Sequence, residues 1–526
     1  MGMYLNIGND GFRAARNGEY VDKSELISVV NSTLCSERQF SCVSRARRFG
    51  KSMAAKMLNA YYDKSCNSHS LFQDLKIASD PSFEKHLNKY PVIFLDMTEF
   101  VTQFRDDASI VDYIQLKLIK ELQTTYPNVD YSFGNDLLSV LYAITKQVET
   151  QKFIMIIDEW DAIFREFAPE SNIAAKYIDL LRMLFKPVNS MTIFAAVYIT
   201  GILPIKKYNT QSALNNFEEY TMIAPGEMAP YFGFTDSEVS DLCTRYHVDK
   251  DQIKLWYDGY QLGNQKSIYN PLSVIRAISR NYCESYWSNT GTFDTITHYI
   301  KLNYDGLKDD IINLLAGGRC HVNTKNFQND LNVINSKNDV FTILIHLGYL
   351  AYDRLNSECY IPNKEVNIEF ANAIEDTGWH IVAEAIRQSN QLLKFTLNGD
   401  EKQVAQAIDR IHSDNTSILQ YNDENSLACV LTLAFYAAKN TYTMIRELPT
   451  GKGYADIVLL PNQGITTSAI VIELKYNQSA QTAISQIKEK QYCNSLLDYT
   501  GEIVLVGINY NKQTKQHICI IEKTKK

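Results

Sequence analysis

Two segments near the C-terminus decide the fold of that part of the chain, and they read Ala455-Asp456-Ile457-Val458 and, after one turn, Ile472-Glu473-Leu474-Lys475. The first puts an acid on one strand, and the second puts an acid and a lysine on the next. Because side chains alternate between the faces of a strand, Glu473 and Lys475 point to one face and Leu474 points into the core. Two carboxylates and one ammonium can then surround a single divalent cation. Carboxylates that hold Mg²⁺ or Mn²⁺, beside a lysine that orients a water or stabilises developing charge, are what phosphodiester hydrolysis requires.

A cross-strand cluster of salt bridges on an exposed sheet face is the alternative interpretation of these charges. The neighbouring residues argue against exposure, because both strands are apolar on both faces: Ile457, Val458, Leu459, Ile470, Val471 and Ile472. Burial of Asp456, Glu473 and Lys475 in such a sheet is costly unless a metal or tight pairing offsets it. The sequence therefore favours a metal site over a salt-bridge cluster.

Length and composition describe a globular protein of more than one domain. The chain has 526 residues, of which 45% are hydrophobic and 21% are charged. A single core seldom serves so many residues, so about two to four domains are expected. No apolar run reaches the roughly 18 residues of a membrane helix, and no signal peptide is visible at the N-terminus. We therefore expect an intracellular protein, cytoplasmic or nuclear, with no membrane partner.

Charge is unevenly distributed along the chain. The net charge of −8 argues against a nucleic-acid surface over the whole chain. Residues 421–526, however, contain eleven Lys and Arg against nine Asp and Glu, a balance of +2 that leaves −10 for the first 420 residues. The segment that carries the metal pattern is therefore mildly basic, which agrees with a phosphate-rich substrate.

Apolar runs and helical periodicity divide the chain into three regions. In the first third, buried strands alternate with helices, which is typical of an α/β domain with a mostly parallel sheet. The strands are predicted at 40–44, 92–95, 153–157 and 193–199, and the helices at 53–62, 110–126 and 173–185. Residues 217–397 look mainly helical. The last hundred residues return to strands at 444–447, 455–460, 469–476 and 503–507, with helices at 427–439 and 480–497 and a turn at 461–464.

A second motif lies between the first predicted strand and its helix: Arg45-Ala46-Arg47-Arg48-Phe49-Gly50-Lys51-Ser52. In a phosphate-binding loop of this kind, backbone amides and the helix N-terminus hold phosphate, Lys51 reaches the β- and γ-phosphates and Ser52 contacts Mg²⁺. The pattern G-x-x-x-x-G-K-[ST] has glycine where this chain has Arg45. A basic loop that merely contains Gly-Lys-Ser is therefore the alternative.

Two acids at the end of an apolar strand, Asp158 and Glu159, supply the other half of a nucleotide site. In such a site Asp158 supports the Mg²⁺ shell and Glu159 polarises the attacking water. A solvated helix start is the alternative for this pair. Thr200 ends a later strand at the same edge of the sheet, where a polar group would sense the γ-phosphate. The alternative, a Thr-Gly pair that merely ends a strand, fits the sequence equally well.

These motifs resemble those of a family of proteins with an AAA-ATPase-like N-terminal domain and a C-terminal PD-(D/E)XK nuclease domain. The resemblance covers most of the chain, and many short matches in one order are more specific than any single motif. Besides the motifs above, it rests on Tyr20-Val21-Asp22-Lys23, Trp160-Asp161, Leu214-Asn215-Asn216, Tyr231-Phe232-Gly233-Phe234-Thr235, Trp256-Tyr257-Asp258-Gly259-Tyr260, Tyr269-Asn270-Pro271, Tyr286-Trp287-Ser288-Asn289-Thr290-Gly291 and Ile361-Pro362-Asn363-Lys364-Glu365-Val366.

The resemblance implies an α/β multidomain fold with three parts. Residues 1–216 are expected to form a P-loop NTPase-like domain, a parallel sheet with flanking helices. Residues 217–400 are expected to form a helical lid or connector. Residues 401–526 are expected to form a restriction-endonuclease-like α/β/α domain.

The resemblance also implies roles for individual residues. It makes Asp456 and Glu473 metal ligands and Lys475 the catalytic lysine. Glu424 resembles an extra acid, and thus a further metal ligand, that many such nucleases carry, and Gln486 with Tyr492 resembles a glutamine–tyrosine element of RecB-like nucleases. The implied nucleotide-site residues are Arg48, Gly50, Lys51, Ser52, Asp158 and Thr200, with Glu159 as the catalytic residue that polarises the attacking water.

Departures from the family pattern are few. Ala46 replaces a proline of the usual loop, and Tyr454 stands where an arginine often precedes Ala-Asp. Leu203-Pro204 stands where the family tends to place Ser-Arg, so the sensor arginine has no match, and Lys206 or Lys207 is the candidate to replace it.

We therefore expect an ATPase that also carries a metal-dependent nuclease acting on phosphodiester bonds, with nucleotide state gating the cut. The expected cofactors are ATP and Mg²⁺ or Mn²⁺. The expected partner is nucleic acid, DNA in preference to RNA, and a homo-oligomer is expected because ATPases of this broad class often assemble. Two alternatives stay open: an ATP-dependent switch or interaction protein whose nuclease-like domain binds without cutting, and an active nuclease on a domain that no longer hydrolyses nucleotide.

Overall fold

The chain folds into two compact units. The computed structural model describes residues 2–525 except 105–108, 133, 149–151, 168–171, 206, 209–210, 213, 288–292, 303, 305, 316–317, 326, 329–333, 377–379, 415–430, 432–433, 436–437, 439–440, 450–453, 463–464, 491–498 and 500. The first unit comprises Met1–Thr292 and His321–Ile368, and the second comprises Phe293–Cys320 and Glu369–Lys526. The three-part division at 216/217 and 400/401 stays a prediction.

A five-stranded parallel sheet in the order β2-β3-β4-β1-β7 forms the core of the first unit. Its strands are β1 (Phe40–Ser44), β2 (Val92–Asp96), β3 (Phe153–Asp158), β4 (Phe194–Gly201) and β7 (Glu218–Tyr220). The strands β1, β3 and β4 are buried along their whole length, as expected for a parallel sheet covered on both faces. The predicted α/β domain is therefore confirmed, and β7, which no sequence pattern predicts, extends it at one edge.

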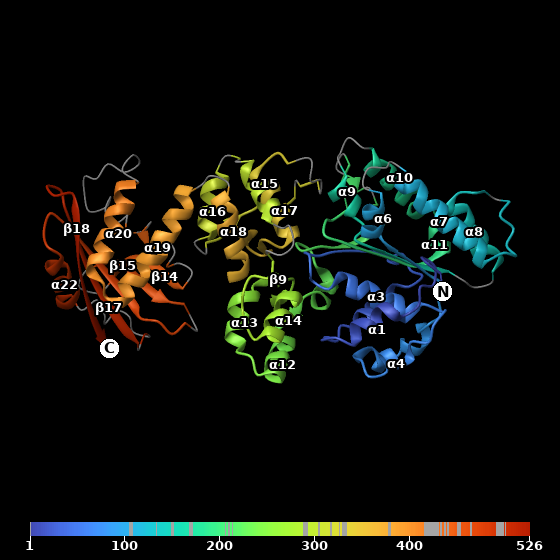
Figure 1. Ribbon diagram of the computed structural model, residues 1–526, viewed down its shortest axis with the longest axis horizontal. Helices are drawn as coiled ribbons and strands as arrows, with labels where there is room; N and C mark the ends of the chain where they lie inside the picture. The colour runs from blue at the N-terminus through green and yellow to red at the C-terminus, as the bar shows by residue number, and fades with distance from the viewer. Residues whose placement is uncertain are drawn as a thin grey trace. The chain divides into compact units, whose positions relative to one another are not determined.

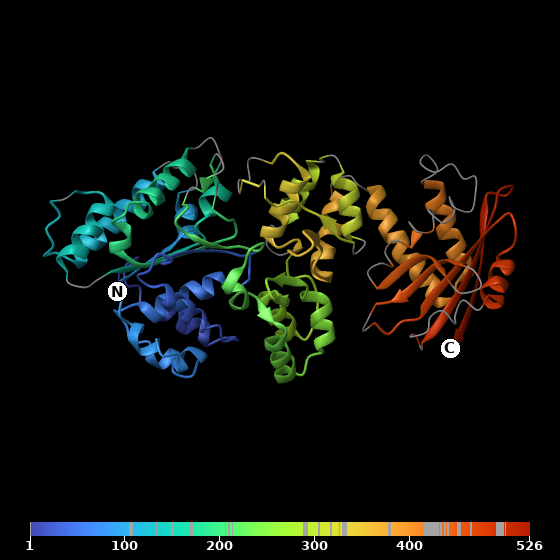
Figure 2. The same ribbon diagram turned by 180° about the vertical axis from the view of Figure 1, so that it is seen from behind.

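Helices cover both faces of this sheet, as Figure 1 and, from behind, Figure 2 show. One face carries α1 (Asp10–Arg16), α3 (Lys51–Tyr62) and α4 (His69–Phe72). The other face carries α6 (Met97–Gln103), α7 (Ile110–Thr125), α8 (Leu137–Gln147), α9 (Ala162–Glu166), α10 (Ile173–Phe185) and α11 (Ser190–Ile193). Helix α10 has the predicted bounds, whereas α3 begins two residues earlier than predicted, at Lys51.

Short helices and small sheets build the rest of the first unit. They are α2 (Leu26–Thr33), η1 (Lys76–Ser79), α5 (Phe83–His86), β5 (Lys207–Tyr208), β6 (Gln211–Ser212), η3 (Gly226–Tyr231), β8 (Phe234–Thr235), α12 (Asp236–Tyr246), α13 (Lys250–Tyr257), β9 (Tyr260–Leu262), β10 (Gln265–Tyr269), α14 (Pro271–Arg280), α17 (Lys337–Leu347), β12 (Ala351–Asp353), β13 (Glu358–Tyr360) and the start of α18 (Lys364–Asp376). Local caps fix the helix starts, since Thr235 and Glu238 form a capping box on α12 and Asn270 caps α14 ahead of Pro271. The helical character expected of residues 217–397 is confirmed, and small antiparallel sheets lie among these helices.

A second five-stranded sheet, in the order β14-β15-β16-β17-β18, organises the second unit. Its strands are β14 (Tyr442–Pro449), β15 (Tyr454–Pro461), β16 (Ala469–Tyr476), β17 (Glu502–Asn511) and β18 (Gln516–Lys525). Only β16 and β17 are parallel, and the other neighbours are antiparallel. Strand β16 has the predicted bounds, and β14, β15 and β17 are longer than predicted.

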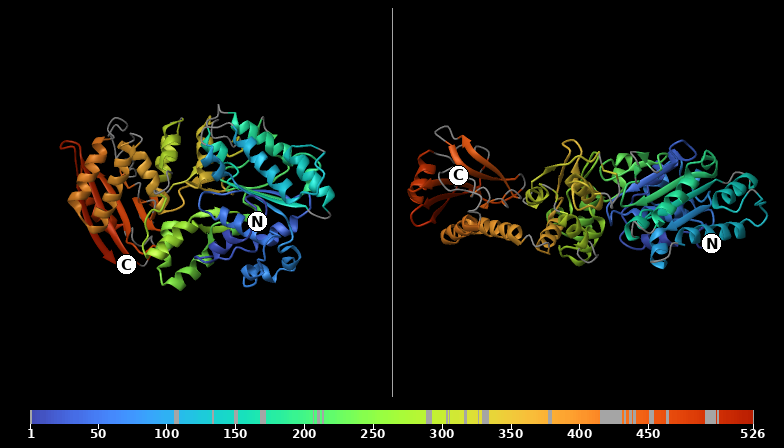
Figure 3. Two further views of the ribbon diagram at one scale, coloured as in Figure 1. Left: turned by 45° about the vertical axis from the view of Figure 1, so that its right-hand side comes forward. Right: turned by 90° about the horizontal axis from the view of Figure 1, so that it is seen from above.

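Helices cover both faces of this second sheet. Ile457, Ile472 and Val506 pack with α19 (His380–Asn398) and α20 (Glu401–Asp414), which lie along one face in Figure 3. The alternate residues Val458 and Val471 pack with α22 (Ala480–Glu489) instead. A mixed sheet between two helical layers confirms the predicted restriction-endonuclease-like α/β/α arrangement.

The second unit also contains α15 (Phe293–Lys301), α16 (Leu307–Leu315) and the part of α18 from Glu369 onward. The short strand β11 (Cys320–His321) spans the boundary between the units. Most of the helix predicted at 427–439 lies outside the described residues, as do the end of the helix predicted at 480–497 and half of the turn at 461–464. Among the described residues, no helix combines the length and the apolar character that crossing a membrane requires.

Candidate nucleotide and metal sites

The predicted phosphate loop forms the turn from β1 into α3. Gly50 is the residue before the helix and has φ +90°, a left-handed conformation that glycine adopts without strain. A Cβ at Gly50 meets no atom within 4 Å, so the backbone conformation, and not lack of space, is what requires glycine here. Arg48 also has a positive φ, of +71°, which is uncommon for a residue with a side chain.

Lys51 is buried beneath this loop, with 4% of its surface exposed. Its Nζ donates a hydrogen bond to the Ala46 carbonyl at 3.1 Å. It also lies 3.5 Å from Glu159 Oε1. The lysine of the loop and the second acid after β3 are thus brought together, as the sequence predicts.

Asp158 ends β3 close to Ser52. The pKa of Asp158 is raised to about 6, chiefly by burial and also by the carboxyls of Glu159 and Asp96, against a hydrogen bond from Ser52 and the charge of Lys51. The Glu159 amide donates to Asp158 Oδ1 at 3.1 Å. A buried carboxylate beside a hydroxyl is a suitable pair of oxygen ligands for Mg²⁺.

Thr200 and Arg48 occupy different surroundings. Thr200 is fully buried at the end of β4, and its hydroxyl has no hydrogen-bond partner among the residues that the structure describes. The Arg48 guanidinium donates to the Tyr286 carbonyl at 2.7 Å, and burial lowers its pKa. The proposed substitutes for a sensor arginine, Lys206 and Lys207, have side chains outside the described part of the chain.

Arg45, which stands where the loop pattern has glycine, is fully buried. Its Nη1 donates to the carbonyls of Ser44 and Tyr220 at 2.9 and 2.8 Å, and the guanidinium lies 5.3 Å from the centre of the Phe232 ring. Burial lowers the pKa of Arg45 to about 10. The side chain therefore joins β1 to β7 and packs on Phe232, the residue after η3.

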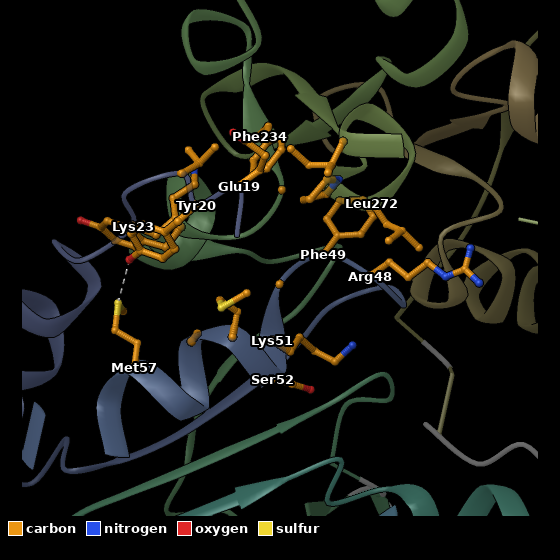
Figure 4. A pocket seen from close by; sticks show the side chains of 18 of the residues that line it. Glu19, Tyr20, Lys23, Arg48, Phe49, Lys51, Ser52, Met57, Phe234 and Leu272 are labelled. Atoms are coloured by element: carbon orange, nitrogen blue, oxygen red, sulfur yellow. Dashed lines mark hydrogen bonds between the residues drawn. The ribbon is translucent and has the colours of Figure 1, made fainter. Parts of the chain in front are cut away.

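A cavity of about 360 Å³ adjoins the loop. Figure 4 shows Tyr20 and Phe234 at one side of it and Met57, Lys51 and Ser52, all from α3, at the other. The remaining lining residues are Glu19, Val21, Lys23, Arg48, Phe49, Gly50, Met53, Ala54, Glu159, Tyr231, Gly233, Pro271, Leu272 and Ile275. Most of these are apolar, and the charged groups of Lys51 and Glu159 lie at the end next to the loop. This combination suits a ligand with a flat apolar part and an anionic tail.

The C-terminal candidate site lies on the α22 face of the second sheet. Pairing of β15 with β16 reaches Ile457 and Ile472, and the next residue on each strand is Asp456 and Glu473. Lys475 Nζ lies 3.1 Å from Glu473 Oε1, and Gln486 Nε2 donates to the same oxygen. The sequence prediction that Glu473 and Lys475 share a face is therefore confirmed.

The carboxylates of this site fit a divalent cation. Glu473 is 2% exposed, and its Oε2 has no hydrogen-bond partner among the described residues. The pKa of Glu473 is raised to about 7, chiefly by burial and also by the charge of Asp456, against the opposing charge of Lys475. An added cation would relieve both effects. Among the described residues, no group of three or more His, Cys, Asp or Glu side chains is arranged to hold a metal, and the predicted Glu424 and Tyr492 lie outside those residues.

Two residues of the N-terminal site are missed by the sequence motifs. Asp96 ends β2 and pairs in register with Asp158. The sequence offered one sign of its role, namely an acid directly after the apolar run of the strand. Arg165 Nη2 lies 2.6 Å from Glu159 Oε2. Nothing in the sequence distinguishes this arginine, because its position depends on how α9 leaves β3.

The chain is similar to several known proteins at low sequence identity. An uncharacterized protein in the vnfD 5' region of Azotobacter chroococcum mcd 1 is 23% identical over 299 residues, which cover 55% of this chain and 54% of that protein, about half the length of the relative. A Walker-type ATPase of Pyrococcus abyssi is 11% identical with a TM-score of 0.32, over 66% of this chain and 94% of that one. The ORC2 protein of Aeropyrum pernix is 12% identical with a TM-score of 0.29, over 68% and 96%.

Two family models match separate parts of the chain. Residues 6–210, which contain the phosphate loop and the acid pair after β3, match the family described as a predicted AAA-ATPase. Residues 422–519, which contain Asp456, Glu473 and Lys475, match the PD-(D/E)XK nuclease superfamily. The chain thus carries a domain of the predicted AAA-ATPase family followed by a domain of the PD-(D/E)XK nuclease superfamily.

Proposed function

We propose that the protein binds and hydrolyses ATP and cuts phosphodiester bonds of nucleic acid in a metal-dependent reaction. In this proposal residues 1–216 are the ATPase-like domain, 217–400 the lid or connector and 401–526 the nuclease domain. The observation that carries the proposal is that each predicted set of charged residues comes together in space. Lys51 and Glu159 lie beside a cavity of ligand size, and Glu473 and Lys475 lie together on one face of the second sheet.

The nucleotide is expected to lie across the cavity and the loop. Tyr20, Phe234 and Leu272 line the end that suits the base, and Lys51 with the amides at the start of α3 binds the phosphates. Mg²⁺, when bound, neutralises phosphate charge and draws electron density from the bridging oxygen. Ser52 and Asp158 are the residues that hold it, and Glu159 polarises the attacking water.

Arg48 and Thr200 are proposed as further nucleotide-binding residues. Arg48 lines the cavity, although its guanidinium donates to the Tyr286 carbonyl. Thr200 has a buried hydroxyl at the carboxyl edge of the sheet, which is where a γ-phosphate sensor is expected.

The nuclease reaction is assigned to the C-terminal site. Asp456 and Glu473 hold Mg²⁺ or Mn²⁺, with Glu424 as a further proposed ligand. The ion, when bound, lowers the pKa of a coordinated water and stabilises charge on the phosphate. Lys475 orients the water and stabilises the developing negative charge. Gln486 donates to Glu473 and so keeps this carboxylate aimed at the cation.

Nucleotide state is proposed to gate the nuclease through the middle region. The supporting contacts are on the back of the phosphate loop and lie within the first unit. The Phe49 ring meets the Tyr260 ring edge-on at 5.0 Å, and the Phe49 carbonyl accepts from the Gly233 amide at 3.0 Å. Gly348 approaches Ala46 so closely that a Cβ there would lie 2.5 Å from the Ala46 Cβ. A loop movement on nucleotide binding therefore displaces residues of the middle region directly.

The substrate proposed is nucleic acid, DNA in preference to RNA, and assembly into a homo-oligomer is proposed as well. The test is cleavage of labelled single- and double-stranded DNA and RNA with Mg²⁺ or Mn²⁺, with and without ATP. Glu473→Ala and Lys475→Ala are expected to abolish cutting. Lys488→Ala is the matched control, because Lys488 lies on α22 but pairs with Glu522 at 2.6 Å. Cutting that survives in Glu473→Ala would contradict the assignment, and equal rates with and without ATP would contradict gating.

A second candidate is an ATP-dependent switch whose nuclease-like domain binds nucleic acid without cutting. It is favoured by the pairing of Glu473 Oε1 with both Lys475 and Gln486, because these contacts hold the carboxylate within the protein without a cation. Binding of labelled DNA that changes with ATP, while no cleavage product forms with any metal, would support this candidate over the nuclease.

A further inference from the structure

The carboxylate of Glu159 is held between two cations. Its Oε2 lies 2.6 Å from Arg165 Nη2, and its Oε1 lies 3.5 Å from Lys51 Nζ. The side chains are nearly enclosed, with 18% of Glu159, 10% of Arg165 and 3% of Lys51 exposed. In such surroundings a charged hydrogen bond holds its partners firmly, because water competes with it little.

Arg165 also connects Glu159 to the end of β4. Its Nε lies 3.3 Å from Asp161 Oδ2. The same oxygen accepts hydrogen bonds from the amides of Ile202 and Leu203 at 3.1 and 2.9 Å. These two residues directly follow the strand end that carries Thr200. The guanidinium thus pairs with two carboxylates: Glu159 through a hydrogen bond and Asp161 through an ion pair. Asp161 in turn binds the backbone that follows β4.

Lys51 lies where Glu159 and a nucleotide phosphate would compete for its charge. Its ammonium contacts the Ala46 carbonyl and Glu159, and its 3.5 Å separation from Glu159 is longer than the 2.6 Å separation of Arg165 from Glu159. A phosphate bound by Lys51 would weaken the pairing of Lys51 with Glu159 and would bring further negative charge beside Glu159. A carboxylate without a fixed partner would then be pushed away by like-charge repulsion.

We propose that Arg165 is a positioning residue for Glu159, which keeps this carboxylate in place once Lys51 has moved to the nucleotide phosphates. Arg165 thereby determines the rate of ATP turnover and not the affinity for ATP. The proposal rests on the proposed role of Glu159 in polarising water. It concerns the regulation of that site from within the chain, since phosphate would compete with Glu159 for Lys51 whenever nucleotide binds.

The test compares Arg165→Gln and Arg165→Lys with the wild type. Phosphate release as a function of ATP concentration gives kcat and KM, and titration with a fluorescent, non-hydrolysable ATP analogue gives Kd. A displaced catalytic group costs about tenfold to a hundredfold in rate, so Arg165→Gln is expected to lower kcat by at least about tenfold with KM and Kd little changed. Arg165→Lys is expected to recover part of kcat, because one ammonium can hold one of the two carboxylates.

Arg182→Gln is the matched control and is expected to behave as the wild type. Arg182 lies on α10 and is 38% exposed, and its pair with Asp179 is a surface contact between neighbouring turns of one helix. Equal kcat in Arg165→Gln and wild type would overturn the inference and leave the proposed function intact. An increase in Kd and a fall in melting temperature, together with the fall in kcat, would overturn it in favour of a structural role. Absence of ATP hydrolysis by the wild type would overturn both proposals.

Discussion

Glu473→Gln is predicted to stabilise the second unit at pH 8 in the absence of divalent cations. Burial and the charge of Asp456 raise the pKa of Glu473 from its ordinary value of 4.5 to about 7, against the opposing charge of Lys475. The folded protein therefore bears an unfavourable buried charge at pH 8. Glutamine has the same shape and no charge, and its amide oxygen can still accept from Lys475 and Gln486.

The direction of this change in stability depends on whether the folded or the unfolded chain loses the Glu473 proton at the lower pH. Below pH 4.5 the carboxyl is protonated in both the folded and the unfolded chain. Between pH 4.5 and 7 the unfolded chain ionises while the folded chain holds its proton, so folding becomes less favourable as the pH rises. Above about pH 7 the loss is complete. The pKa difference corresponds to about 3 kcal/mol, and solvent screening near the edge of the site reduces this to about 2 kcal/mol.

The assay is urea denaturation in EDTA, read by hydrogen exchange of peptides from β15, β16 and β17. A local readout is needed because a chain of several domains does not unfold in one step. Glu473→Gln is expected to be more stable than the wild type at pH 8 and equal to it near pH 4. Glu489→Gln, an exposed acid at the end of α22, is the control and should change nothing. A variant no more stable than the wild type at pH 8 would refute the reasoning.

Three further predictions concern metal, nucleotide and packing. Mn²⁺ binding to the C-terminal site is expected to release a proton below about pH 7. Calorimetry in two buffers of different ionisation enthalpy measures this release, because the observed binding enthalpy then differs between the buffers. A binding enthalpy that is the same in both buffers would count against a carboxyl ligand with a raised pKa. Lys51→Ala is expected to weaken ATP-analogue binding by about 2 kcal/mol, about thirtyfold, in a fluorescence titration, whereas Lys56→Ala, exposed on α3, should leave binding unchanged. Gly201→Ala is expected to cost about 1–3 kcal/mol, because a Cβ there would lie 2.5 Å from Asp161 Oδ1; a melting temperature as little changed as that of Gly11→Ala, whose Cβ has ordinary contacts, would contradict it.

Continuous apolar runs made the central strands predictable. Strands β1 and β16 and helix α10 have the bounds that the sequence indicates, because each is a long apolar or amphipathic run whose burial is determined by its own residues. Strand β7 is different, since it has only three residues, two of them glutamates. Pairing with β1 makes it a strand, and no local pattern carries that information.

Some contacts in the candidate sites follow from local sequence rules, and others depend on how distant segments are placed. The sequence places Glu473 and Lys475 on one face because strand alternation is a local rule, and the structure brings them within 3.1 Å. The contact of Arg165 with Glu159 depends on the backbone between them, where Glu159 has φ +51°. A positive φ at a glutamate is uncommon, so the direction in which α9 leaves the strand is not readable from the residues that precede it.

The first unit is discontinuous, and this has a consequence for the order of events during synthesis. The back of the phosphate loop at Ala46 is covered by Gly348, roughly 300 residues later. A ribosome that adds about 5–20 residues per second needs about 15–60 s to make that stretch. Residues 293–320, which belong to the second unit, emerge during this interval. A short part of the second unit therefore leaves the ribosome before the first unit can close, and this part must wait for residues 369–526 before its own unit can fold.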